Sequence, residues 1–305
     1  MKKQTKKSNI IREEYNMESQ LKEYSEFIKE KERDMSQHTI RMYKYSIELF
    51  LKNMNILDVD QINSLTINEY RRYRDDLLDS GLSKSSVNSH IRNISSFVNW
   101  LFRYEYLSGY PGINKLTPLK LPKKVIFALD QDECKAMVVK TNNLGKKLML
   151  VLMFQTGLRR GEIVEIKLTD IAGNKILVHG KGNKERLLTL TNEACSLLEK
   201  YLQKRKINSE YLFTATGGKL STDAVGQRVK SAAKHAEIDP ERLKKVTAHV
   251  TRKTFATNLV DNGIPINVIQ SALGHSSVNT TMLYAKVHNK NIENAMLSQE
   301  NLIES

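Results

Sequence analysis

The chain has 305 residues, 40% of them hydrophobic, which is enough for two folded domains and excludes a disordered protein. Its formal net charge of +14 points to a polyanionic partner, with nucleic acid first and an anionic membrane surface second. No run of about 18 apolar residues occurs, so no membrane-spanning helix is expected.

Residues 1–16 are predicted to form a basic tail, because no apolar stretch follows them as it would in a secretory signal. The two cysteines, Cys134 and Cys195, lie in helix-like sequence and lack the spacing of a metal site. We therefore expect reduced thiols and a cytoplasmic protein.

Residues 17–112 are predicted to form a small domain of four helices. Ser36 is a predicted cap before HTIRMYKYSIELFLKNM, and Gly81 is a predicted stop for the helix in SLTINEYRRYRDDLLD. The fourth helix carries an apolar stripe at helical spacing. Its members are Val87, Ile91, Ile94, Phe97, Val98 and Leu101.

The polar faces of these helices are rich in cations, hydroxyls and amides, which bind phosphate by charge and by hydrogen bonds. Each such residue alone is compatible with an ordinary charged surface. In a chain this basic, we interpret the set as a DNA-contacting face. The candidates are Arg41, Lys44, Lys84, Ser85, Asn88 and Arg92.

Residues 113–125 contain Pro118 and Pro122 among several lysines and are predicted to be an extended basic linker, neither helix nor strand. Residues 126–305 then mix helix and strand patterns. Helices capped by Asp130 and Thr191 flank an apolar core helix in LGKKLMLVLMFQTG and a β-hairpin in GNKILVHGKGNKERLLTL. Further helices are predicted around 222–236, 247–261, 265–272 and 278–286. The predicted fold is mainly α with a small β-sheet.

Four short motifs in this second region can act on a phosphate. TGLRRGEIVEIKLTD places Arg159 at a turn, where Glu162 could pair with it or cap the next helix. HGKGNKER places Lys181 between glycines at a hairpin tip, where the backbone can approach a ligand closely. Alone, Arg159 is compatible with a structural ion pair and Lys181 with an exposed turn.

The other two motifs lie further along the chain. HVTRKTFAT puts His249 and Arg252 three residues apart on one predicted helix, with Phe255 expected on its buried side. ALGHSSVNTTMLYAKV puts His275 after a glycine and Tyr284 on the helix that follows. A tyrosine in this position is either half-buried packing or a nucleophile.

The order arginine, loop lysine, His-x-x-Arg, Gly-His, tyrosine resembles the tyrosine recombinase (phage integrase) family, most closely its Xer-like bacterial members. The resemblance covers nearly the whole chain and departs at Lys253, where many relatives have histidine. It implies a helical core-binding (SAM-like) domain followed by an α+β catalytic domain, which together clamp DNA.

The resemblance also implies the chemistry. Tyr284 would attack the scissile phosphate and form a 3′-phosphotyrosyl link, while Lys181 protonates the leaving 5′-oxygen. Arg159 and Arg252 would bind the non-bridging oxygens. His249 would take the tyrosine proton or bind the phosphate, to which His275 would donate a hydrogen bond. Neither a metal nor any other cofactor is expected.

The expected partners are double-stranded DNA and either a homotetramer on two DNA sites or a second recombinase, with no membrane. Three apolar residues of the last segment, Ile292, Met296 and Leu297, are expected to dock on a neighbouring protomer or to pack within the chain. The alternatives are a type IB topoisomerase-like enzyme, a DNA-binding protein that does not cleave, and a basic membrane-surface protein. Dimer resolution, integration and excision, and inversion all stay open, as does the DNA target.

Overall fold

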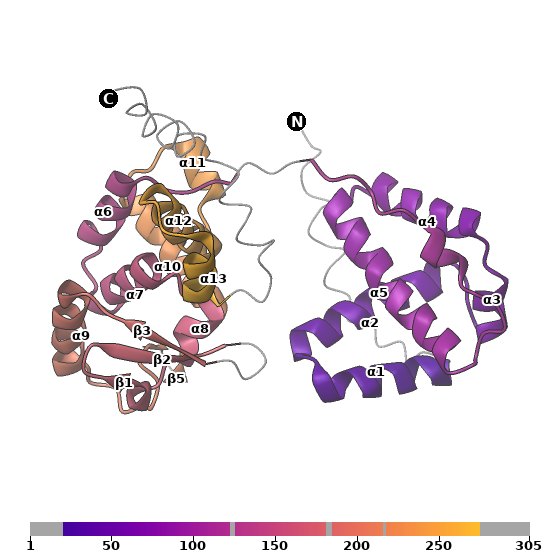
Figure 1. Cartoon of the computed structure of the whole chain (residues 1–305), viewed down its shortest axis with the longest axis horizontal. Coiled ribbons are helices and arrows are strands. Elements are labelled where there is room, and N and C mark those ends of the chain that lie inside the picture. The colour runs from indigo at the N-terminus through magenta and orange to yellow at the C-terminus, as the bar shows by residue number, and fades with distance from the viewer. Residues whose placement is uncertain (1–20, 123–125, 181–184, 216–217, 275–305) are drawn as a thin grey trace, which may run out of the picture. The chain divides into compact units, whose positions relative to one another are not determined.

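The computed structural model describes residues 21–122, 126–180, 185–215 and 218–274 (Figure 1). The chain divides into two compact units, residues 1–123 and 124–305. Lys181, His275 and Tyr284 lie outside the described residues, as do the basic tail and the terminal segment with Ile292 and Met296.

The first unit is helical. Ser36 caps its second helix as predicted, since its hydroxyl accepts a hydrogen bond from the backbone N–H of Thr39. The sequence predicted four helices, but the described residues form five. The missed helix, α3, has only six residues and begins at a capping box of Asp58 and Gln61. The helices are α1 (Lys22–Asp34), α2 (Gln37–Asn53), α3 (Val59–Ser64), α4 (Ile67–Asp79) and α5 (Lys84–Arg103).

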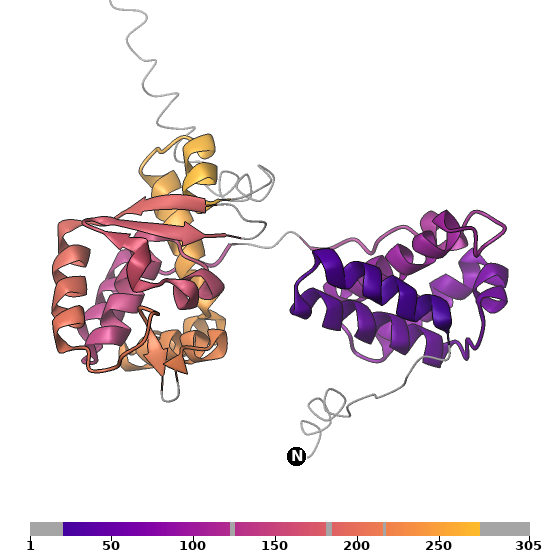
Figure 2. The ribbon, with the colours of Figure 1, turned by 90° about the horizontal axis from the view of Figure 1, so that it is seen from below.

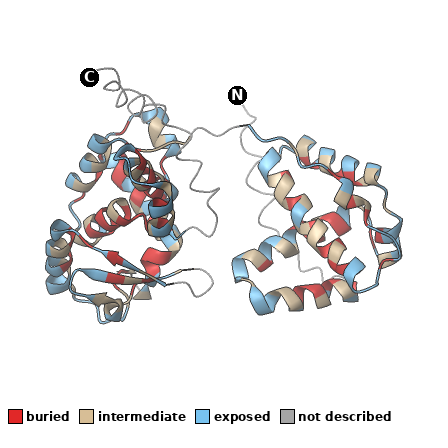
Figure 3. Cartoon of the chain, in the orientation of Figure 1, coloured by how far each residue is buried: buried red, intermediate tan, exposed pale blue. Residues whose placement is uncertain are grey.

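The buried residues of these helices lie along the sides that face one another (Figure 3). Several of them are aromatic. Phe27 contacts Phe97 edge to face with ring centroids 5.3 Å apart, which joins α1 to α5. The predicted linker is partly wrong, because the chain continues as a one-turn 3₁₀ helix, η1 (Gly112–Lys115), that buries Ile113 in this core. Pro111 is the N-cap residue of that turn, where the missing N–H of proline removes no helical hydrogen bond.

The second unit contains the predicted hairpin. Strands β2 and β3 pair antiparallel (Figure 2). Lys175 lies opposite Thr189, and His179 opposite Glu185. A two-residue strand, β1, extends them to a sheet of order β1-β2-β3. The strands are β1 (Ile171–Ala172), β2 (Lys175–His179), β3 (Glu185–Thr189), β4 (Thr214–Ala215) and β5 (Gly218–Lys219), the last two forming a separate antiparallel pair.

The apolar helix α7 is the centre of this unit, and all residues from Leu148 to Met153 are buried. It packs against α9 and α12. Asp130 and Thr191 cap their helices through their side chains, as predicted. The elements are α6 (Gln131–Val139), α7 (Leu144–Thr156), α8 (Arg160–Glu165), η2 (Leu168–Asp170), α9 (Asn192–Lys204), α10 (Thr222–His235), α11 (Pro240–Lys245), α12 (Ala248–Asp261) and α13 (Ile266–Leu273).

The predicted fold class, mainly helical with small antiparallel sheets, is confirmed. Within the described residues, no helix is long and apolar enough to cross a membrane. Nor do these residues contain a group of three His, Cys, Asp or Glu side chains that could bind a metal ion.

Candidate active site

The TGLR motif is a tight turn between α7 and α8. Gly157 ends α7 in the left-handed region at φ +63°, where residues with a Cβ are strained. A Cβ added there would lie 2.4 Å from Cδ1 of Phe255 and 3.0 Å from Cδ2 of Leu273. Only glycine therefore lets α12 and α13 pack this closely against the turn that presents Arg159.

Arg252 is a buried arginine, with 5% of its surface exposed. Its Nη1 donates to the carbonyl of Gly157 at 2.8 Å, and its Nη2 donates to the carbonyl of Leu273 at 2.5 Å. Buried charge is tolerated where it is hydrogen-bonded, and these carbonyls belong to helix ends that lack helical donors. Arg252 thus joins three motifs that are far apart in the sequence.

Arg159 reaches the same place from α8. Its Nη2 donates to the carbonyl of Gly274 at 3.2 Å, next to the carbonyl that Arg252 binds. Two cations therefore meet at the C-terminal end of α13, where the helix dipole is negative. His275 is the next residue in the chain, and Tyr284, the predicted nucleophile, follows it. The arginines therefore bind the two carbonyls that directly precede the predicted nucleophile segment in the sequence.

Glu162 fixes Arg159, and both roles foreseen for it occur together. Its Oε2 accepts from the backbone N–H of Arg159 at 2.8 Å, and its Oε1 accepts from Nη1 of Arg159 at 2.6 Å. The buried carboxylate also binds Arg186 on β3. Burial would raise the pKa of Glu162, but the hydrogen bonds from Arg186 and Arg159 hold it at about 2.

Sequence reasoning missed Arg186. The residue follows the lysine motif in GNKERLLTL, where it looks like one more cation in a basic hairpin. A usable signal was its position in the hairpin, where Arg186 on β3 pairs with buried Val178 on β2 and so lies on the same face of the sheet. A charged residue at such a position requires a buried partner.

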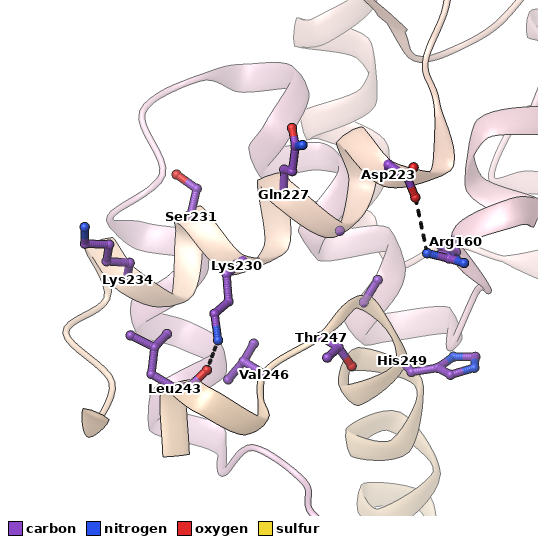
Figure 4. A pocket seen from close by; sticks show the side chains of 12 residues that line it. Arg160, Asp223, Gln227, Lys230, Ser231, Lys234, Leu243, Val246, Thr247 and His249 are labelled. Carbon is purple, nitrogen blue, oxygen red and sulfur yellow. Dashed lines mark hydrogen bonds and ion pairs between the residues drawn. The ribbon is translucent and has the colours of Figure 1, made fainter. Parts of the chain in front are cut away.

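His249 lies in the first turn of α12 at the protein surface, in contrast to buried Arg252. It lines a groove of about 910 Å³ together with Arg160, Thr247 and residues of α10 (Figure 4). The pKa of His249 is lowered, first by partial burial and then by Lys253, Arg252, Arg160 and Arg159. A neutral imidazole near pH 7 can accept a proton or a hydrogen bond, as the proposed chemistry requires.

Thr247 occupies the N-cap position of α12, but its side chain makes no cap hydrogen bond. Phe255, expected on the buried side, is half-buried and covers Gly157.

The six DNA-contact candidates of the first unit lie on α2 and α5. Arg41, Lys84, Ser85 and Arg92 are exposed. Lys44 forms an exposed ion pair with Glu32 at 3.3 Å. Asn88 has a structural role, because its amide exchanges two hydrogen bonds, of 2.8 and 2.9 Å, with the backbone of Leu119.

Comparisons with protein families match both units. Residues 21–105 match the phage integrase N-terminal SAM-like domain, and residues 128–291 match the phage integrase family. The second match spans the turn with Arg159, the hairpin, α12 and the segment with Tyr284.

Individual relatives match over most of their length. The chain is 33% identical over 277 residues to tyrosine recombinase XerA of Pyrococcus horikoshii, which covers 88% of this chain and 90% of the relative. It is 31% identical over 296 residues to tyrosine recombinase XerD of Staphylococcus saprophyticus, covering 90% of this chain and 96% of the relative.

A solved structure of the XerH site-specific recombinase bound to palindromic difH substrate, a post-cleavage complex, shares the fold. Its TM-score is 0.71 at 20% identity, over 91% of this chain and 84% of that one. The family matches and the two relatives, taken with the meeting of the arginine motifs at the end of α13, confirm the resemblance: this chain belongs to the phage integrase family of tyrosine recombinases.

Proposed function

We propose that this chain is a site-specific recombinase that cleaves and rejoins double-stranded DNA through a 3′-phosphotyrosyl intermediate. One observation carries the proposal: Arg159 and Arg252, from separate helices, hydrogen-bond adjacent carbonyls immediately before His275. Two guanidinium groups at Leu273 and Gly274, which directly precede the segment with Tyr284 in the sequence, suit a scissile phosphate, whose non-bridging oxygens accept paired N–H donors.

In the proposed cleavage step, the Oη of Tyr284 attacks the phosphorus and the bond to the 5′-oxygen breaks. The products are a phosphotyrosyl link to the 3′ side and a free 5′-hydroxyl, which takes its proton from Lys181. Arg159 and Arg252 bind the charge that builds on the non-bridging oxygens. Attack by a 5′-hydroxyl of another strand reverses the step, so the energy of the phosphodiester bond is retained and no ATP is needed.

The histidines complete the proposed site. The lowered pKa of His249 supports a neutral imidazole that takes the proton of Tyr284 or accepts a hydrogen bond. His275 donates a hydrogen bond to the phosphate. The partners in this proposal are duplex DNA and further recombinase subunits, either four copies of this chain on two DNA sites or copies paired with a second recombinase.

A covalent-trap experiment tests the function. Wild type and Tyr284→Phe are incubated with nicked suicide duplexes built from DNA that flanks the gene, and a denaturing gel reports protein–DNA adducts. Tyr211→Phe is the matched control, because Tyr211 is in the same unit and contacts Lys167 and Lys219 through its ring, which phenylalanine keeps.

An adduct with wild type and Tyr211→Phe but not with Tyr284→Phe is the expected result. An adduct that persists in Tyr284→Phe contradicts the assigned nucleophile. Tight binding to every duplex without any adduct favours a DNA-binding protein that does not cleave. Relaxation of supercoiled DNA without strand exchange favours a topoisomerase-like enzyme.

A further inference from the structure

Arg186 is a second guanidinium on the carboxylate that holds Arg159. Its Nη1 donates to Oε1 of Glu162 at 3.0 Å and its Nη2 donates to Oε2 at 2.9 Å, a two-point ion pair. The side chain is 14% exposed. It also covers the turn after α13, since a Cβ added at Gly274 would lie 3.4 Å from Nη1 of Arg186.

The charge of the Glu162 carboxylate depends more on Arg186 than on Arg159. Glu162 is buried, and a buried carboxyl tends to take a proton unless donors stabilise its charged form. Among the described residues, the charged groups that face it are Arg186 from β3 and Arg159 from the start of α8. Arg159 makes one side-chain hydrogen bond to the carboxylate, whereas Arg186 makes two.

We propose that Arg186 is a positioning residue for recombination: it clamps the Glu162 carboxylate and, through it, fixes the guanidinium of Arg159 at the end of α13. This inference rests on the proposed function for the role of Arg159. Arg186 itself acts on Glu162, not on the phosphate. Loss of Arg186 lets Glu162 take a proton more readily, and a neutral carboxyl holds the Nη1 of Arg159 weakly.

The first measurement is the single-turnover rate of covalent-adduct formation by wild type and Arg186→Gln from about pH 8 to about pH 5. At the alkaline end the variant is expected to be slower by about 10²-fold, the scale of loss when a catalytic group is misplaced by about 1 Å. The deficit should grow as pH falls, because Glu162 becomes protonated in the variant but stays charged in wild type. Taking the ratio of the two rates cancels the titration of the other groups.

Three further variants separate positioning from folding. Arg186→Lys keeps the charge and should recover part of the rate. Glu162→Gln removes the titrating group, so its deficit should not depend on pH, and adding Arg186→Gln to it should cost little more. Arg205→Gln is the matched control: Arg205 also binds through Nη2 and has a buried Nε without a partner among the described residues, but its acceptors are the carbonyls of Ser209 and Tyr211.

The second measurement needs no DNA. The melting temperature is followed over the same pH range for wild type, Arg186→Gln and Arg205→Gln. A depressed carboxyl pKa adds stability above its unfolded value, and that stability is lost as pH falls through the folded value. In Arg186→Gln the folded pKa of Glu162 is higher, so the gap in melting temperature from wild type should narrow on acidification. The gap for Arg205→Gln should stay constant.

The proposal is supported if, as pH falls, the rate deficit of Arg186→Gln relative to wild type grows while its gap in melting temperature narrows. A rate ratio or a stability gap that is flat with pH overturns it, as does a rate for Arg186→Gln equal to that of wild type. If wild type forms no adduct on any duplex, the proposed function fails. The melting curves still decide whether Arg186 controls the charge of Glu162.

Discussion

Arg252 donates from Nη2 to the carbonyl of Leu273 at 2.5 Å, so a buried arginine of α12 fixes the last residue of α13. The same guanidinium binds Gly157 through Nη1. In the proposed reaction this arginine also binds the phosphate. The hydrogen bonds to Gly157 and Leu273 therefore also hold the Arg252 guanidinium in position for the phosphate. Replacing Arg252 should lower both the stability of the fold and the rate of cleavage.

Replacing Arg252 by Gln is expected to lower both the free energy of unfolding and the rate of cleavage. The carbonyls of Gly157 and Leu273 lose their charged donors, and each unsatisfied buried group costs about 1–3 kcal/mol. Adduct formation should fall by about 10²- to 10³-fold, the scale for loss of one charge-stabilising donor. Denaturant unfolding and single-turnover cleavage measure the two effects. Arg252→Lys keeps the charge but loses the two-pronged guanidinium, so its stability and rate should lie between those of wild type and Arg252→Gln. An unfolding free energy of Arg252→Gln equal to that of wild type contradicts the structural role.

Local signals predicted the parts of the fold that depend on neighbouring residues. Ser36, Asp130 and Thr191 cap helices because each accepts a hydrogen bond from a backbone N–H a few residues ahead. The β2–β3 hairpin follows from two alternating runs around a glycine-rich turn. Elements of six residues or fewer, such as α3 and α11, carry too few apolar positions to establish a period and were missed.

The site was predictable in its residue types but not in its connections. Glu162 on α8 and Arg186 on β3 are 24 residues apart in the sequence, so only the folded chain pairs them. Likewise, His249 and Arg252 lie one turn apart on α12, but neighbouring helices bury the arginine and leave the histidine exposed. Asn88 resembles a phosphate ligand in sequence, and its use by the backbone of Leu119 depends on where η1 directs the chain.

Gly157→Ala should destabilise the second unit strongly. The added methyl group would meet Phe255 at 2.4 Å and would sit on a residue at φ +63°. Positive φ alone costs a non-glycine residue about 1–2 kcal/mol, and overpacking adds about 1–3 kcal/mol. Thermal unfolding measures the sum.

Gly173→Ala is the matched control for that variant, because Gly173 has φ +57° but no atom within 4 Å of an added Cβ. Its loss of stability reports positive φ alone. The difference between the two variants then reports the contact with Phe255. Equal losses would show that the packing of α12 against the turn does not require glycine.

The pH profile of cleavage should reflect the cations around His249. Partial burial of the His249 ring is the largest cause of its lowered pKa, and Lys253 is the first of the neighbouring charges. A histidine that must be neutral loses activity as pH falls through its pKa, so the acid limb due to His249 should lie below its ordinary value of about 6.5. Lys253→Gln removes one repelling charge and should move this limb upward.

Lys234→Gln is the control for Lys253→Gln, since Lys234 lines the same groove as His249 but is not among the charges that lower its pKa (Figure 4). Its acid limb should match that of wild type. A limb that fails to move in Lys253→Gln contradicts the assignment to His249. The contribution of His249 to stability follows the same direction. Because its pKa is lower in the folded than in the unfolded state, the folded protein loses stability as pH falls below about 6.5.

The first unit allows DNA contact to be separated from folding with two substitutions on one helix. Arg92→Gln removes an exposed cation of α5, so affinity for any duplex should fall and the slope of log K against log salt should shrink by about 1. Asn88→Ala removes two hydrogen bonds to Leu119, each worth about 0.5–1.5 kcal/mol, and should lower the melting temperature without changing the slope. Lys29→Gln, an exposed cation on α1, is the control for net charge. An equal drop in slope for Lys29→Gln and Arg92→Gln would show that binding follows overall charge, and that α5 is not the contacting face.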